Sequence, residues 1–192
     1  MLGSSASICS TAAYLLQSTI VPTFASRESR MNREFHTLTM LVENEPGVTA
    51  RVSGLFASRN YNIETICGAP TANPRMSRIT ITTRANPDQL EQIMKQLRRL
   101  VNVIKVRDMT EEKAVQREMA LICVKALPAD RPEIRSIVES FRGRIVDTGR
   151  NHYIIEVTGR QDKIDALVRL LEPMEIKKLA RSGILALYRE AD

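Results

Sequence analysis

The turn at residues 44–48, Asn-Glu-Pro-Gly-Val, has the residue types needed to bind a carboxylate. It follows an apolar stretch and leads into a segment with apolar residues at helical spacing. The first N–H groups of a helix have no partner inside it and attract anions, and Gly47 lets a ligand approach them closely. An ordinary strand-to-helix turn is an open alternative, with Asn44 or Glu45 capping the helix and Pro46 in its first turn.

Four strands and two helices are expected around this turn, in the order βαββαβ. One strand alternates Ile79 and Ile81 with threonines, as a half-buried strand does, and the second helix has apolar residues at i, i+3, i+4 and i+7. The expected strands are 36–43, 61–69, 76–83 and 101–108, and the expected helices are 46–58 and one that begins at Asn86-Pro87. This order is that of the split-βαβ, ferredoxin-like arrangement.

The same order is expected a second time. The first helix of this unit begins near Asp130 and is expected to end at Gly143 as a C-cap, and Pro173 ends the second. The expected strands are 119–126, 144–148, 153–158 and 184–188. The fold class is therefore α+β, with two tandem ferredoxin-like βαββαβ domains.

These patterns divide the chain into four parts. Residues 1–33 contain seven serines and are expected to lie outside the fold, as an organelle transit segment or as the result of a start upstream of Met31. Residues 34–109 form the first domain, 110–118 a polar linker or short helix, and 119–192 the second domain.

Composition and motifs argue against several classes of function. Hydrophobic residues make up 43% of the chain and charged residues 26%, which are ordinary values for a globular protein. No apolar run approaches the roughly 18 residues of a membrane span, so no membrane partner is expected. An RNA-recognition domain needs aromatic residues on its central strands, but residues 37–42 and 76–83 contain none, so no nucleic-acid partner is expected.

No catalytic or metal-binding constellation is recognisable. Cys9, Cys67 and Cys123 show no CxxC spacing and are expected to be buried structural thiols or, in the case of Cys9, part of the N-terminal segment. His36 and His152 have no Cys or acidic neighbour at ligand spacing. We therefore predict no catalytic residue, no metal ligand and no cofactor in this chain, which favours a binding or regulatory module.

Many short motifs, in order, resemble those of the small regulatory subunit of acetolactate synthase, also called acetohydroxyacid synthase. The resemblance covers roughly residues 34–189. The motifs are Asn-Glu-Pro-Gly-Val at 44–48, Arg-Val-Ser-Gly-Leu-Phe at 51–56, Arg-Asn-Tyr-Asn-Ile-Glu at 59–64, Met-Ser-Arg-Ile-Thr-Ile at 76–81, Phe-Arg-Gly-Arg-Ile-Val-Asp at 141–147 and Ala-Arg-Ser-Gly at 180–183.

The resemblance implies an N-terminal ACT domain, a homodimer formed through ACT domains, and a large catalytic subunit as partner. That subunit would hold thiamine diphosphate, Mg and FAD, and would make the first common intermediate of valine, leucine and isoleucine biosynthesis. The small subunit would activate it and confer feedback inhibition by valine. Such a complex would be cytoplasmic in a bacterium, or in the plastid stroma if residues 1–33 are a transit peptide. The alternative is a stand-alone ACT sensor of another biosynthetic enzyme.

The resemblance also implies a valine site between two ACT domains. Backbone N–H groups around Gly47 and Val48 would bind the valine carboxylate, and Asn44 would orient the zwitterion. Asn62 would come from the facing subunit, or would simply satisfy a strand end. The predicted effector-binding residues are Asn44, Pro46, Gly47, Val48, Asn62 and Ile63.

Overall fold

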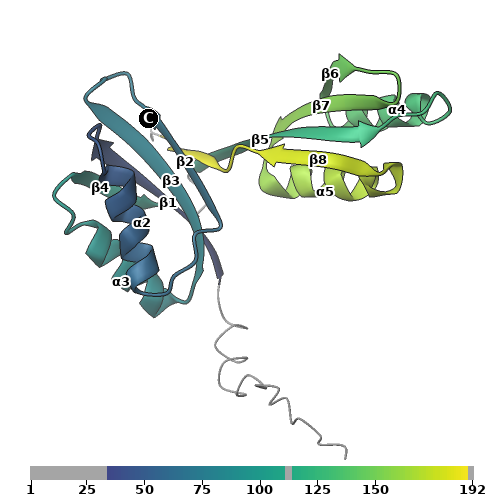
Figure 1. Cartoon of the computed structure of the whole chain (residues 1–192). Helices are drawn as coiled ribbons and strands as arrows, with labels where there is room; N and C mark the ends of the chain where they lie inside the picture. The colour runs from purple at the N-terminus through teal and green to yellow at the C-terminus, as the bar shows by residue number, and fades with distance from the viewer. Residues whose placement is uncertain (1–33, 111–113, 190–192) are drawn as a thin grey trace, which may run out of the picture. The chain divides into compact units, whose positions relative to one another are not determined.

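The structure is a computed structural model, and it describes residues 34–110 and 114–189 (Figure 1). The expectations for residues 1–33, including Cys9, lie outside this part of the chain. Two domains follow one another along the described residues, and each contains its own hydrophobic core.

The N-terminal domain is a four-stranded antiparallel sheet with two helices on one face (Figure 1). Its strands occur in the order β2-β3-β1-β4, which is the ferredoxin-like order expected from the sequence. The elements are β1 (Glu34–Glu43), α2 (Val48–Ser58), β2 (Thr65–Pro70), β3 (Met76–Ala85), α3 (Pro87–Leu97) and β4 (Val103–Asp108).

The core of this domain lies between the sheet and its helices. In the β1–β3 ladder Leu38 is opposite Ile81 and Met40 is opposite Ile79, and all four are buried. Buried residues of the helices pack on them, as the helical periodicity predicted: Val48, Val52 and Phe56 from α2 and Ile93 and Leu97 from α3.

The start of α3 is fixed by local interactions. The Asn86 side chain accepts a hydrogen bond from the backbone N–H of Gln89, and the Gln89 side chain accepts one from the backbone N–H of Asn86. Pro87 occupies the first helical position, where no N–H is needed. The predicted start at Asn86-Pro87 is confirmed.

The start of α2 differs from the expectation. The helix begins at Val48 and not at Pro46, which lies in the turn before it. Gly47 is the N-cap residue in the left-handed conformation, with φ 85°, and no side chain of the described residues caps the helix. The alternative in which Asn44 or Glu45 caps α2 is therefore excluded, because Gly47 is the N-cap residue and the turn reverses with a positive φ at that glycine.

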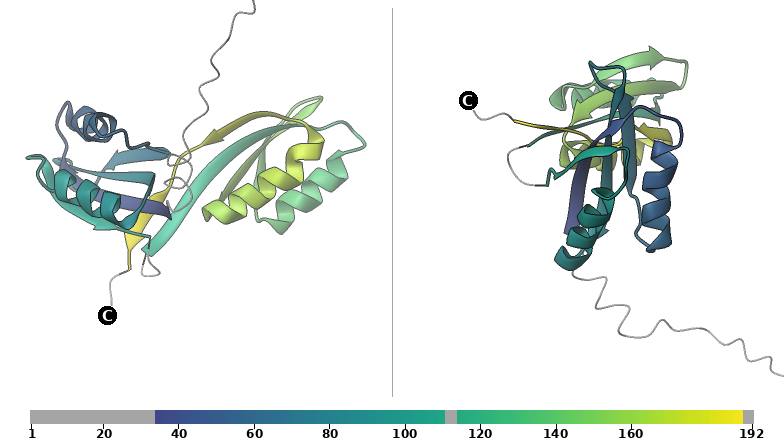
Figure 2. Two further views of the ribbon diagram at one scale, coloured as in Figure 1. Left: turned by 90° about the horizontal axis from the view of Figure 1, so that it is seen from below. Right: turned by 90° about the vertical axis from the view of Figure 1, so that its left-hand side faces the viewer.

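The C-terminal domain has a similar architecture. Its central sheet has the order β6-β7-β5-β8, and α4 and α5 lie side by side on one face of it (Figure 2). The elements are β5 (Ala114–Lys125), α4 (Arg131–Ser140), β6 (Arg144–Thr148), β7 (His152–Gly159), α5 (Gln161–Leu171), a 3-10 turn (Glu172–Met174), β8 (Ile176–Arg181) and β9 (Leu185–Tyr188).

Two expectations for this part of the chain need correction. The fourth strand of the sheet is β8, whereas the predicted final strand corresponds to β9, which pairs with residues 114–117 at the start of β5. β8 has lysines at positions 177 and 178, so its apolar alternation is weak, as at many sheet edges. Residues 114–118 belong to β5 and not to a linker or short helix.

Gly143 does not end α4 in the way that was expected. The residue with positive φ is Arg142, at 52°, so Gly143 is not the left-handed cap. A Cβ at Gly143 would lie 3.1 Å from both the Glu156 carbonyl oxygen and Val138 Cγ1. The position thus requires glycine for a close approach between α4 and β7 and not for its backbone freedom.

Candidate functional site

A small depression of about 230 Å³ lies at the start of α2 and is lined by Asn44, Glu45 and Val48 of the 44–48 turn, whereas Pro46 and Gly47 do not line it. Its walls come from the end of β1, the first residues of α2, the exposed edge strand β2 and the start of β3. The lining residues are Val42, Glu43, Asn44, Glu45, Val48, Thr49, Gly68, Ala69, Pro70, Ser77 and Ile79. Pockets for drug-sized ligands occupy roughly 300–1,000 Å³, so this depression is suited to a smaller molecule.

Gly47 leaves the helix start accessible. A Cβ at this position would meet no atom nearer than Nη2 of Arg51, at 4.0 Å. No side chain of the described residues caps α2, and the Val48 N–H makes only a long hydrogen bond, 3.4 Å, to the Glu45 carbonyl oxygen, so the first turn of the helix can still donate to a ligand. An anion placed there would also benefit from the positive end of the helix.

Asn44 is held against the β2–β3 turn. Its Nδ2 donates to the carbonyl oxygen of Pro74 at 3.0 Å, and its Oδ1 accepts from the Ser77 hydroxyl at 3.0 Å. Its backbone N–H donates to the carbonyl oxygen of Arg75 at 2.8 Å. The amide therefore has a fixed orientation at the rim of the depression, with one further proton and one further lone pair for a ligand.

Asn62 and Ile63 do not reach this depression within one chain. They precede β2, which begins at Thr65 and not at residue 61. The carbonyl oxygen of Asn62 accepts a hydrogen bond from the hydroxyl of Thr83 on β3. The lining residues of the same strand, Ser77 and Ile79, lie six and four residues from Thr83, or roughly 13–20 Å away. Asn62 is exposed and donates to the Glu64 carboxylate at 3.1 Å, whereas Ile63 packs half-buried on the core.

Two residues beside the turn were missed by the sequence reasoning. Asn102 is almost buried, and its Nδ2 donates to the carboxylates of Glu43 at 2.7 Å and Glu45 at 3.0 Å. Its Oδ1 accepts from Nη1 of Arg51, whose other terminal nitrogen is the group nearest to Gly47. The position of Arg51, four residues after Gly47 on the same face of a helix, was the only signal available in the sequence.

Comparison with known proteins identifies both domains. Residues 38–105 match the family described as the AHAS small subunit-like ACT domain, and residues 117–190 match the family described as the small subunit of acetolactate synthase. The chain belongs to the acetolactate synthase small-subunit family. The N-terminal domain is accordingly an ACT domain.

Other members of the acetolactate synthase small-subunit family match over most of their length. The acetolactate synthase small subunits of Mycolicibacterium smegmatis and Bacillus subtilis are 44% and 43% identical, covering 80% and 79% of this chain and 91% and 89% of theirs. A probable small subunit of Archaeoglobus fulgidus is 46% identical over 80% of this chain and 96% of its own. The crystal structure of the small subunit from Thermotoga maritima has a TM-score of 0.76 and 40% identity, over 83% of this chain and 99% of that one.

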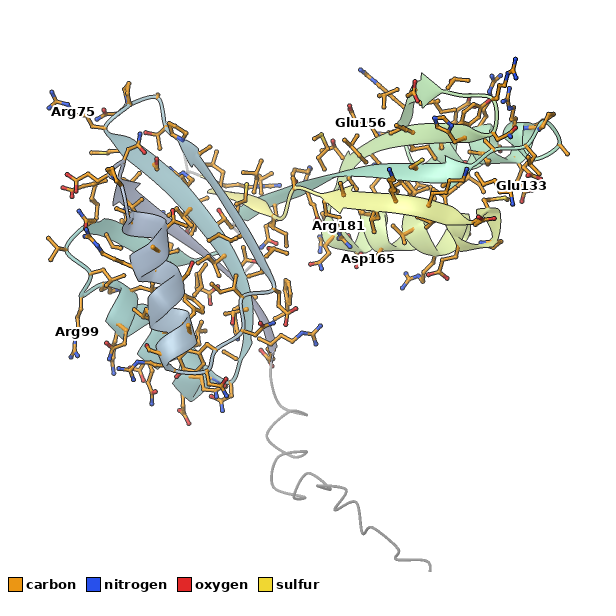
Figure 3. The ribbon with its side chains drawn as sticks, viewed as in Figure 1. Arg75, Arg99, Glu133, Glu156, Asp165 and Arg181 are labelled. Atoms are coloured by element: carbon orange, nitrogen blue, oxygen red, sulfur yellow. The ribbon has the colours of Figure 1, made fainter. Side chains whose placement is uncertain are left out.

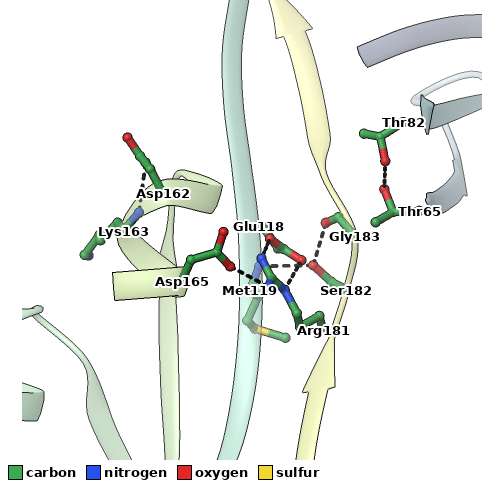
Figure 4. A network of polar contacts seen from close by, with 10 residues as sticks. All are labelled: Thr65, Thr82, Glu118, Met119, Asp162, Lys163, Asp165, Arg181, Ser182 and Gly183. Atoms are coloured by element: carbon green, nitrogen blue, oxygen red, sulfur yellow. Dashed lines mark hydrogen bonds and ion pairs between the residues drawn. The ribbon is translucent and has the colours of Figure 1, made fainter. Parts of the chain in front are cut away.

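This small subunit also contains an ionic cluster in its C-terminal domain (Figure 4). The Arg181 guanidinium donates to both oxygens of Glu118, at 2.8 and 2.6 Å, and to the carboxylate of Asp165 at 2.6 Å. Figure 3 shows Arg181 of β8 and Asp165 of α5 next to one another. Hydrogen bonding to Glu118 raises the pKa of Arg181, although burial acts in the opposite direction, so the arginine is charged throughout the physiological range.

Three further features concern the possible metal ligands, thiols and helix lengths of the described residues. Among these residues, no three His, Cys, Asp or Glu residues are placed to bind a metal ion. Cys67 and Cys123 are free thiols. Both were expected to be buried, but both are only half-buried. No described helix is long and apolar enough to cross a membrane.

Proposed function

We propose that this chain is a regulatory subunit that raises the activity of the catalytic subunit of acetolactate synthase and makes it sensitive to valine. Family membership supports the catalytic partner. Thiamine diphosphate, Mg and FAD would belong to that partner. The complex would make the first common intermediate of valine, leucine and isoleucine.

The observation that carries the valine assignment is the helix start beside the depression, which no side chain of the described residues caps. The accessible N–H groups around Gly47 and Val48 would bind the valine carboxylate. The fixed amide of Asn44 would hydrogen-bond to one end of the zwitterion, and Pro46 would shape the turn. Val48 and Ile79 supply apolar surface suited to a small branched side chain.

A second copy of the chain would complete the site. β2 is an edge strand, and its residues Gly68, Ala69 and Pro70 are exposed beside the depression. If two β2 strands pair antiparallel about a two-fold axis, the beginning of one strand lies beside the end of the other. Asn62 and Ile63 of the second copy would then approach the depression that their own chain cannot reach.

Valine bound between two ACT domains would favour one packing of the dimer, and the catalytic subunit would respond to that packing. Coupling between allosteric sites is typically about 1–3 kcal/mol, or roughly 5- to 150-fold in affinity. A change in the hydrogen bonds of one interface is sufficient to supply this energy.

The direct test is acetolactate formation by the cognate catalytic subunit, with and without this chain, across a valine titration. We expect the chain to increase the rate, and valine to reduce the rate only when the chain is present. Absence of both effects would overturn the proposed function. Activation without a response to valine, together with binding of a different amino acid, would replace valine as the effector.

A further inference from the structure

The turn between α3 and β4, residues 98–102, is tied to the 44–48 turn by Asn102. Both N–H groups of the Asn102 side-chain amide donate, to Glu43 and Glu45, and its Oδ1 accepts from Arg51. The Asn102 carbonyl oxygen also accepts from the backbone N–H of Glu43 at 2.9 Å. Asn102 is only 7% exposed, so water cannot replace a partner that moves away, and the side-chain amide would be left without a hydrogen bond. The two turns are therefore expected to move together.

Arg51 connects this network to the proposed effector. Its guanidinium donates to Asn102 through Nη1, and Nη2 is the nearest atom to the open space beside Gly47. A carboxylate bound at the start of α2 would lie close to this cation and would compete with Asn102 for it. Arg51 would thus interact differently with Asn102 in the valine-free and valine-bound states, and such a difference is what a ligand-driven change requires.

The far side of the α3–β4 turn has the character of a contact surface. Val101 is 93% exposed at its tip, and Ile104 is 51% exposed at the start of β4. Arg98, Arg99 and Lys105 are exposed around them, and none forms an ion pair with another described residue. Figure 3 shows the side chain of Arg99 pointing away from the domain.

We propose that the α3–β4 turn contacts the catalytic subunit, and that Arg51 and Asn102 transmit the state of the effector site to it. This inference rests on the proposed function. Val101 would enter an apolar pocket of the catalytic subunit, and Arg98, Arg99 and Lys105 would face acidic residues at the rim of that pocket. An apolar centre within a polar rim is the usual anatomy of a protein–protein interface.

Val101→Asp tests the surface, because it places an anion and a polar group where the partner would bury a valine. We expect the concentration of this chain that gives half-maximal activation to rise roughly tenfold or more, with the dissociation constant of valine for the free chain unchanged. Val146→Asp is the matched control, since Val146 is also an exposed valine, at 52%, but lies on β6 of the C-terminal domain. A Val101→Asp chain with the wild-type midpoint, or an equal loss in both variants, would overturn the proposal.

Asn102→Ala tests the connection between the two turns. We expect this variant to bind valine but to lose most of the inhibition measured at saturating valine. Arg51→Met removes the other side of the same contact and is the second variant if Asn102→Ala does not fold, because the Arg51 side chain is exposed; its inhibition is measured at valine concentrations that saturate the variant. Full maximal inhibition in whichever variant folds would contradict the transmission. If the wild-type chain neither activates nor responds to valine, the proposed function fails first; if it does both, these variants test the further inference alone.

Discussion

Arg181 binds Glu118 through two parallel hydrogen bonds, across the ladder between β8 and β5. Glu118 is only 2% exposed, so the guanidinium is the group that makes burial of its charge tolerable. Asp165 from α5 binds the same arginine, which ties the helix to both strands. The cluster lies at the end of β8, whose last residue is Arg181.

Loss of this arginine should destabilise the C-terminal domain. Arg181→Met leaves the Glu118 carboxylate buried without its ionic partner, and we expect a loss of about 2–3 kcal/mol in the free energy of unfolding. This value is at the lower end for a buried pair because Arg181 is partly exposed. Lys178→Met on the same strand is the control, since Lys178 is exposed. Denaturant unfolding combined with hydrogen exchange of β5 and β8 amides would measure the effect, and equal stability of the two variants would contradict it.

An acidic residue at position 47 should weaken the binding of valine. Gly47→Asp places an anion beside the expected carboxylate and weakens valine binding by more than about 1.4 kcal/mol, or tenfold. Gly47→Asn is the control because asparagine has the same shape, tolerates a positive φ and is neutral. Isothermal titration with valine should show a much smaller loss for Gly47→Asn. Equal losses would attribute the effect to the backbone and not to charge.

Two defective chains should restore one another if the site is shared between copies. Gly47→Asp damages the turn and Asn62→Ala damages the contribution of the second copy, so both valine sites are defective in each homodimer. A mixed dimer contains one site with both elements intact. If equal amounts pair at random, we expect about a quarter of the wild-type number of valine sites to return. If a mixture shown to contain mixed dimers recovers no valine sites, then either both residues belong to the site of one chain or one of them does not belong to the site.

The ion pair between Lys125 and Glu175 should give a pH-dependent contribution to stability. The hydrogen bond from Lys125 lowers the pKa of Glu175 from 4.5, and the same contact raises the pKa of Lys125 from 10.5. The contribution of Glu175 is therefore present above pH 4.5 and is lost as the pH falls through its lower folded-state pKa. The contribution of Lys125 is present below pH 10.5 and is lost as the pH rises through its higher folded-state pKa.

Carboxyl NMR titration would measure this coupling directly. In Lys125→Met the pKa of Glu175 should rise towards its ordinary value, whereas Lys178→Met should have little effect. Because both side chains of the pair are largely exposed, salt should weaken the coupling. A Glu175 pKa that is unchanged in Lys125→Met would show that the pair does not persist in solution.

Several features of the fold were predictable because their causes lie within a few residues. The start of α3 at Asn86 depends on a residue three positions away, and the apolar faces of α2, α3 and α5 follow from helical periodicity alone. The strand β8 was not predictable in this way, because its lysines obscure the alternation and its place in the sheet depends on pairing with β5.

The sequence alone determined the two ferredoxin-like domains and predicted a carboxylate site at the 44–48 turn, because residue spacing and glycine act locally. Only the tertiary structure decided what surrounds that turn. Asn102 reaches Glu43 and Glu45 across more than fifty residues of chain, and Asn62 is held beside Thr83 of β3, too far from the depression of its own chain to enter it. Such relationships depend on strand pairing and loop closure between distant segments, which no local pattern of residues encodes.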